Sequence, residues 1–146
     1  MDRALKVEKE VVIQASPDVV WKALTNREII KKYFFGTEAI SDWKVGSSLI
    51  FQGEWEGKTY QDKGTILAAE PGKMLQYNYW SGFSGLEDVP ENYSLVTYRL
   101  SSGTEPDQTT LVLTQEGFAG EEALAHAEGG WTMVLDNLKT LLESYS

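Results

Sequence analysis

The C-terminal stretch, residues 121–145, reads EEALAHAEGGWTMVLDNLKTLLESY and decides how the rest of the chain can fold. Its apolar residues recur every three or four positions, as on one face of an α-helix. They are Leu124, Ala127, Trp131, Val134, Leu135, Leu138, Leu141, Leu142 and Tyr145. A helix of about 25 residues would be roughly 37 Å long. It therefore needs a broad apolar surface to lie on, which the preceding residues must supply.

Length, composition and charge limit the class of protein. A chain of 146 residues, 42% of them hydrophobic, fits a single domain over residues 1–146. The sequence has no run of about 18 apolar residues that could span a membrane, and its N-terminus lacks the apolar centre of a signal peptide. We therefore expect a cytoplasmic protein. A net charge of −9 disfavours binding to nucleic acid. Cysteine is absent, which excludes disulfides and thiolate chemistry.

The first 36 residues predict one strand followed by two short helices. A period of two places alternate residues on one face of the strand, namely Leu5, Val7, Val11 and Ile13. Ser16 and Pro17 then begin a helix, because serine is a favoured N-cap and proline suits the first helical position. Asn26 separates this helix from a second one over residues 27–34, and Gly36 ends the second helix.

From residue 38 onward the period of two predicts short antiparallel strands joined by turns. We expect a short strand and turn at 41–46 and longer strands at 49–55, 60–68, 75–80, 96–100 and 111–116. The predicted fold is therefore α+β. It is a helix-grip fold, in which a curved antiparallel sheet of six to seven strands wraps around the long C-terminal helix, with two short helices after strand one.

The inward faces of these strands carry an unusual number of polar aromatic rings. With two residues of the long helix they make a candidate ligand-binding set: Phe51, Trp55, Tyr60, Tyr77, Tyr79, Tyr98, Gln115, Trp131 and Leu135. A buried tyrosine hydroxyl needs a partner or water. One interpretation is that the rings fill the core and their hydroxyls reach the rim of the sheet. The other is an amphipathic pocket that binds a small hydrophobic molecule.

The longest connection, residues 81–92, carries three apolar side chains: Phe83, Leu86 and Val89. It is near the upper length for a loop without regular structure. Two interpretations remain open, a surface loop that tucks its own apolar residues inward and a lid over the mouth of a cavity.

Candidate catalytic residues are few. Asp62 falls on the inward face, where burial would suit a general base, but a single β-bulge would turn it to solvent. Glu128 and His126, the single histidine, are expected to be exposed on the helix. With one histidine and no cysteine we expect no metal site, and without a Gly-rich phosphate loop no nucleotide cofactor. Catalysis is therefore not expected.

Several motifs together resemble the family of activators of heat-shock-chaperone ATPase homologues. They are the segment 11–25 with its Ser-Pro-Asp-Val-Val-Trp, DWKVG at 42–46, GTI at 64–66, EPGKML at 70–75, Gly117-Phe118 and the segment 130–138. The resemblance covers nearly the whole chain. It implies a START-like domain, also called SRPBCC, Bet v 1-like or polyketide cyclase-like.

The resemblance implies a hydrophobic cavity between the sheet and the long helix, but not a single activity. Family members include ligand-binding and lipid-transfer proteins, cyclases and a stress-response co-chaperone, so a heat-shock chaperone is a possible partner. The eukaryotic co-chaperone has a further N-terminal domain, for which residues 1–146 leave no room. We therefore expect binding of an aromatic or lipid-like ligand, with a chaperone-associated role and a cyclase-type enzyme as alternatives.

Overall fold

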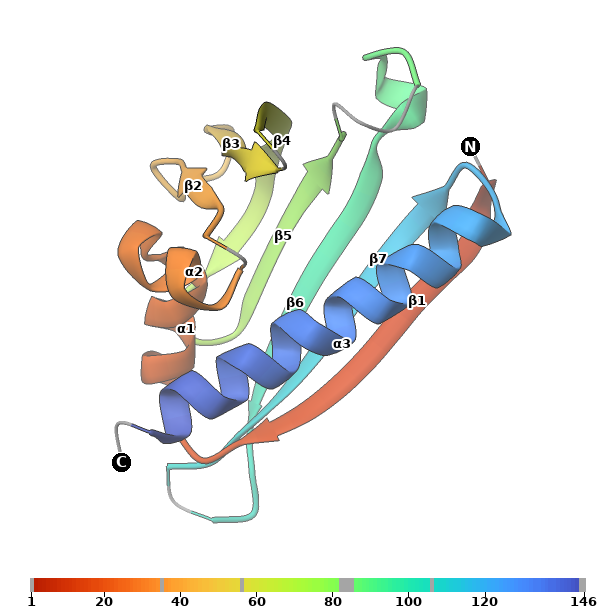
Figure 1. The fold of residues 1–146 in the computed structure, drawn as a ribbon. Coiled ribbons are helices and arrows are strands. Elements are labelled where there is room, and N and C mark those ends of the chain that lie inside the picture. The colour runs from red at the N-terminus through yellow and green to blue at the C-terminus, as the bar shows by residue number, and fades with distance from the viewer. Residues whose placement is uncertain (1, 35, 56, 82–85, 106, 145–146) are drawn as a thin grey trace.

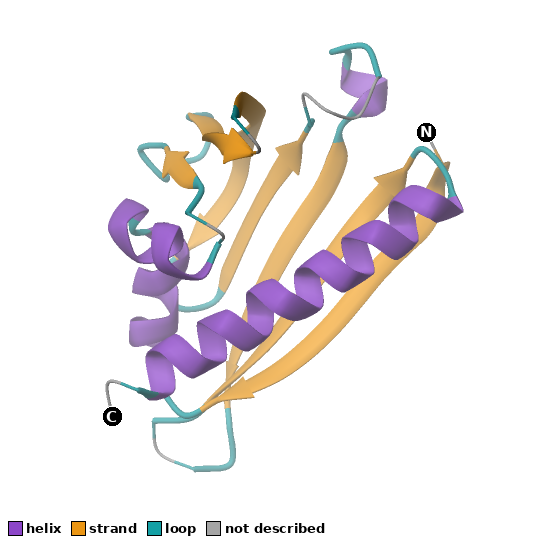
Figure 2. Cartoon of the chain, in the orientation of Figure 1, coloured by secondary structure: helices purple, strands orange, loops and turns teal. Residues whose placement is uncertain are grey.

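One antiparallel sheet of seven strands carries the long helix α3 on one face (Figures 1 and 2). The computed structural model describes residues 2–34, 36–55, 57–81, 86–105 and 107–144. The strands are β1 (Asp2–Ile13), β2 (Glu38–Ile40), β3 (Ser48–Trp55), β4 (Lys58–Glu70), β5 (Met74–Tyr79), β6 (Ser94–Ser102) and β7 (Thr109–Phe118). Their order is β1-β7-β6-β5-β4-β3-β2, so β2 to β7 form a meander and β1 closes the far edge. This is the predicted helix-grip fold.

The helices are α1 (Pro17–Thr25), α2 (Arg27–Tyr33) and α3 (Glu121–Glu143), with a 3-10 turn η1 (Pro90–Asn92). The Ser16 side chain accepts a hydrogen bond from the Val19 amide (3.3 Å), which confirms the predicted N-cap. The Asn26 side chain caps α2 by accepting from the amides of Glu28 (3.0 Å) and Ile29 (3.1 Å). Both short helices lie beside the C-terminal half of α3 (Figure 1).

The prediction of a short strand at 41–46 is wrong, because the strand lies earlier, at Glu38–Ile40. The residues that follow form a turn. Trp43 has a φ of 58° and Gly46 a φ of 90°, and extended strands do not contain such angles. The Ser41 hydroxyl fixes the turn by accepting a hydrogen bond from the Trp43 amide (3.0 Å).

A β-bulge in β4 shifts the inward face of the strand. Ile66 pairs with Tyr77, but Ala68 pairs with Gln76, so one residue is extra on β4. After the bulge the alternation is shifted by one residue, so that Ala69 rather than Ala68 packs on the core. Asp62 precedes the bulge and stays on the inward face opposite Phe51, where it is 8% exposed.

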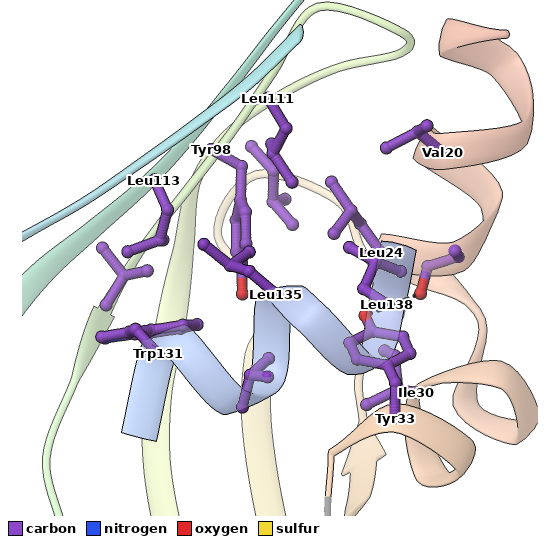
Figure 3. Close-up of a cluster of buried hydrophobic side chains, with 14 of the residues drawn as sticks. Val20, Leu24, Ile30, Tyr33, Tyr98, Leu111, Leu113, Trp131, Leu135 and Leu138 are labelled. Atoms are coloured by element: carbon purple, nitrogen blue, oxygen red, sulfur yellow. Dashed lines mark hydrogen bonds between the residues drawn. The ribbon is translucent and has the colours of Figure 1, made fainter. Parts of the chain in front are cut away.

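One part of the core lies where α1 and α2 meet the C-terminal half of α3. Figure 3 shows α3 side chains here facing those of α1, α2 and the sheet. The buried residues it labels are Val20, Leu24, Ile30, Tyr33, Tyr98, Leu111, Leu113, Trp131, Leu135 and Leu138. The core therefore holds the C-terminal half of the helix on the sheet.

The close approach of β4 to β5 requires glycine at position 64. A Cβ there would lie 1.8 Å from the backbone oxygen of Asn78, whose side chain also accepts a hydrogen bond from the Thr65 amide (2.7 Å). Gly64→Ala should therefore lower the free energy of unfolding by about 3 kcal/mol or more, measured by urea denaturation.

The matched control is Gly129→Ala, because no atom lies within 4 Å of a Cβ at that helical position. This change should raise stability by about 1 kcal/mol through helix propensity. Equal effects of the two substitutions would contradict the account of Gly64.

Candidate ligand-binding cavity

A cavity of about 890 Å³ lies between the sheet and the N-terminal half of α3. Its volume is in the range of pockets that hold small organic molecules, roughly 300–1,000 Å³. The sheet side is lined by Phe51, Tyr77, Tyr79, Ser81, Val96 and Gln115, together with Phe34 from the end of α2. The helix side is lined by Ala119, Gly120, Glu122, Ala123, His126, Ala127, Gly130, Trp131 and Val134.

The cavity exists because the helix presents small side chains at this end. Ala123, Ala127 and Gly130 face the sheet at helical spacing, and no atom lies within 4 Å of where a Cβ at Gly130 would be. Further along the same stripe the residues are large and buried, as with Leu138 and Leu142. A helix held at one distance from the sheet fills the space where its side chains are large and leaves it open where they are small.

Aromatic rings form a continuous wall around the cavity. Phe34 stacks on Phe51, with ring centroids 5.8 Å apart and planes at 21°, and meets the Trp131 ring edge-on at 6.0 Å. Phe51 in turn contacts Tyr77 (5.8 Å) and Tyr79 (5.9 Å). Because each ring rests on another, the wall is pre-formed and offers flat apolar surface to a ligand.

Gln115 joins the helix to the sheet at the base of the cavity. Its Oε1 accepts a hydrogen bond from the Trp131 Nε1 (2.7 Å), and its Nε2 donates to the Ser94 hydroxyl (2.9 Å). Ser94 donates to the backbone oxygen of Tyr79 (3.3 Å). Gln115 is 8% exposed, so this chain satisfies polar groups that are otherwise shielded from water. Gln115, which the sequence analysis placed in the ligand-binding set, is thus hydrogen-bonded within the protein to both Trp131 and Ser94.

The tyrosine hydroxyls around the cavity are uncharged hydrogen-bonding groups. Tyr79 donates to the Asp62 carboxylate (2.5 Å), and burial, followed by the Asp62 charge, raises the pKa of Tyr79 well above its ordinary value. Burial likewise raises the pKa of Tyr77 and Tyr98. The cavity therefore has one polar end, formed by Tyr79 with Asp62 behind it.

The structure divides the predicted ligand-binding residues into two groups. Those that line the cavity are Phe51, Tyr77, Tyr79, Gln115 and Trp131. Tyr98 and Leu135 are buried without lining it, since Tyr98 packs behind Tyr77 and Trp131. Tyr60 folds over Gly53 and its hydroxyl is bonded to that of Thr37 (2.5 Å), away from the cavity. The side chain of Trp55 lies outside the described part of the structure.

The described part of the connection 81–92 is anchored to the sheet. Leu86 and Val89 are half-buried and do not line the cavity, and the Leu86 carbonyl accepts a hydrogen bond from the Trp80 indole (3.2 Å). Asp88 forms an ion pair with Lys63 of β4. Phe83, the third residue of the predicted lid, lies outside the described residues.

Sequence reasoning did not identify the helical residues that open the cavity. Ala123, Ala127 and Gly130 belong to the predicted apolar stripe or adjoin it. Their side chains are small compared with Leu138 and Leu142 on the same stripe, and this difference in size was the available signal for a cavity. His126 is exposed, as predicted, yet it also borders the cavity one turn after Glu122. Phe34 carried no such signal, because its place depends on how α2 packs on the sheet.

A seven-stranded sheet gripping one long helix over an aromatic cavity defines the class: a START-like helix-grip domain. Residues 14–143 match the family model AHSA1, described as activator of Hsp90 ATPase homolog 1-like protein. The chain therefore belongs to the AHSA1 family. No curated protein matches it.

Solved structures agree with this assignment. A protein from Cytophaga hutchinsonii is 42% identical, with a TM-score of 0.83 and coverage of 99% of this chain and 98% of that one. CalU16 from Micromonospora echinospora is 27% identical, with a TM-score of 0.73 and coverage of 93% and 73%. The Aha1 dimer from Colwellia psychrerythraea, at 21% identity, shares the fold with a TM-score of 0.73 and coverage of 94% and 96%.

Among the described residues, no helix is long and apolar enough to cross a membrane. The same residues contain no group of three or more histidine, aspartate or glutamate side chains placed to hold a metal ion.

Replacing Gln115 by leucine should be costly, because the Trp131 indole and the Ser94 hydroxyl would both lose a buried partner. We expect Gln115→Leu to lower the free energy of unfolding by about 2–3 kcal/mol in urea denaturation. Gln76→Leu is the control, since Gln76 is half-buried and bonds Thr97 (3.1 Å) away from the cavity. Its cost should stay below about 1 kcal/mol. A smaller loss for Gln115→Leu than for Gln76→Leu would refute the bridging role.

Proposed function

We propose that this protein binds a small hydrophobic ligand, aromatic or lipid-like, in the cavity between the sheet and the N-terminal half of α3. The observation that carries the proposal is the cavity itself, about 890 Å³ in volume and walled by packed aromatic rings. Its helix side is kept open by Ala123, Ala127 and Gly130. Two glycines in a row, Gly129 and Gly130, weaken a helix, so an open cavity gives a reason for the second of them.

The geometry favours binding over catalysis. A general base must come within hydrogen-bonding reach of its substrate. Among the described residues Asp62 is the one buried carboxylate. It does not line the cavity, because the Tyr79 ring lies between Asp62 and the cavity and donates a hydrogen bond to its carboxylate. Asp62 is therefore a positioning residue that fixes the Tyr79 ring in the cavity wall.

The cavity can be tested by filling it. N-phenyl-1-naphthylamine, an uncharged fluorescent aromatic, should bind the native protein with enhanced emission. Gly130→Phe should lower its affinity about tenfold or more, because a ring at this position enters the open space that a ligand would occupy.

Gly129→Phe is the matched control. Gly129 is exposed, does not line the cavity and has equal room for a Cβ. The same substitution at this neighbouring position should therefore leave the affinity for the probe within about twofold of the native value. In labelled protein, amide shifts on binding should cluster at Tyr77, Tyr79, Gln115 and Gly130. Binding that is insensitive to Gly130→Phe, or a failure of uncharged aromatic and alkyl probes to bind, would overturn the proposal.

A chaperone-associated role is the second candidate, and its support is the family itself. The description of the family model names activation of Hsp90 ATPase, and a Plasmodium falciparum Hsp90 activator shares the fold at 20% identity. If this role holds, adding the protein should raise the ATPase rate of a cognate Hsp90 in a concentration-dependent way. A rate that stays constant up to a large excess of the protein would eliminate the role without affecting the ligand-binding proposal.

A further inference from the structure

We propose that the cavity selects uncharged ligands and rejects anionic ones with the same carbon skeleton. The inference rests on the proposed ligand-binding function and narrows it, since it excludes fatty acids and other carboxylates, sulfonates and phosphates. It follows from the charges that border the cavity rather than from its shape.

The lining contains no lysine or arginine among the described residues. The residues outside the described part add none, because positions 1, 35, 56, 82–85, 106 and 145–146 hold neither amino acid. Within the described part of the lining Glu122 is the one carboxylate, and it is exposed at the mouth, on the first turn of α3. His126, one helical turn later, is the one lining side chain able to carry positive charge, and the Glu122 carboxylate is available to offset it.

The polar end of the cavity is also unfavourable for an anion. The Tyr79 hydroxyl donates a hydrogen bond to the Asp62 carboxylate behind it, so its hydrogen is not available to a ligand. An anionic group placed beside Tyr79 would face the charge of Asp62 through one phenol ring. A hydroxyl or carbonyl group carries no such penalty.

One feature of the site attracts anions, the N-terminal end of α3. Ala119 and Gly120 line the cavity there, and a helix N-terminus carries roughly half a positive charge. Glu121 and Glu122 in the first turn bring two full negative charges to the same end. The carboxylates therefore outweigh the dipole, and the protein as a whole, with a net charge of −9, adds to the repulsion.

The test compares three probes with one anilinonaphthalene skeleton. They are N-phenyl-1-naphthylamine, 8-anilino-1-naphthalenesulfonate and the corresponding uncharged sulfonamide, which matches the sulfonate in size. Affinities are measured by fluorescence titration at about pH 8, where histidine side chains are ordinarily uncharged. The sulfonamide should bind at least about tenfold more tightly than the sulfonate, because an anion buried without a partner loses its hydration.

Charge reversal at the mouth provides the second arm. Glu122→Lys should raise affinity for the sulfonate about fivefold or more relative to affinity for the sulfonamide, because it replaces the lining carboxylate with a cation. Glu121→Lys changes the net charge equally, and both glutamates are exposed, but Glu121 does not line the cavity, so its effect should be smaller.

The outcomes separate the two proposals. A sulfonate that binds as tightly as the sulfonamide overturns the charge selection and leaves ligand binding intact. Equal gains from Glu121→Lys and Glu122→Lys also overturn it, because the effect would then come from net charge rather than from the cavity. If none of the three probes binds, the ligand-binding proposal fails and the selection fails with it.

Discussion

The hydrogen bond from the Trp131 indole to Gln115 is the interaction on which the structure of the cavity depends (2.7 Å). It ties the middle of α3 to β7, and Gln115 continues the tie to Ser94 on β6. On the C-terminal side of this bond the helix packs into a filled core through Leu138 and Leu142. On the N-terminal side the helix borders the cavity through Ala123, Ala127 and Gly130. The bond therefore marks the boundary between the filled core and the cavity.

This division explains features that are unfavourable in a helix considered alone. Gly129 and Gly130 each cost roughly 1 kcal/mol relative to alanine, and small residues at Ala123 and Ala127 bury little surface. The C-terminal half of α3, packed against α1 and α2, holds the helix in place despite these losses. The N-terminal half thereby keeps its distance from the sheet without filling the gap, which is the condition for a cavity.

Much of the fold followed from local patterns, because period and capping act over a few residues. The helix α1 begins after Ser16 at Pro17, and Asn26 separates it from α2, as predicted. The helical spacing of apolar residues in α3 identified its buried face. The position of β2 could not be predicted, since the positive φ of Trp43 turns the chain where alternation suggested a strand. The cavity lining was predicted only in part. Whether a ring such as Tyr77 or Tyr98 faces open space depends on which residues α3 places opposite, and the sequence of one strand does not contain that information.

The central claim is that one half of α3 is packed on the core and the other half borders a cavity. Hydrogen exchange along α3 in the free protein tests this claim most directly. Amides 134–142 should exchange only through near-global unfolding, whereas amides 125–130 should open at a free energy lower by about 2 kcal/mol or more. A ligand in the cavity should reduce that difference. Uniform protection along the whole helix in the free protein would contradict the account, because it would show that the N-terminal half is packed as firmly as the rest.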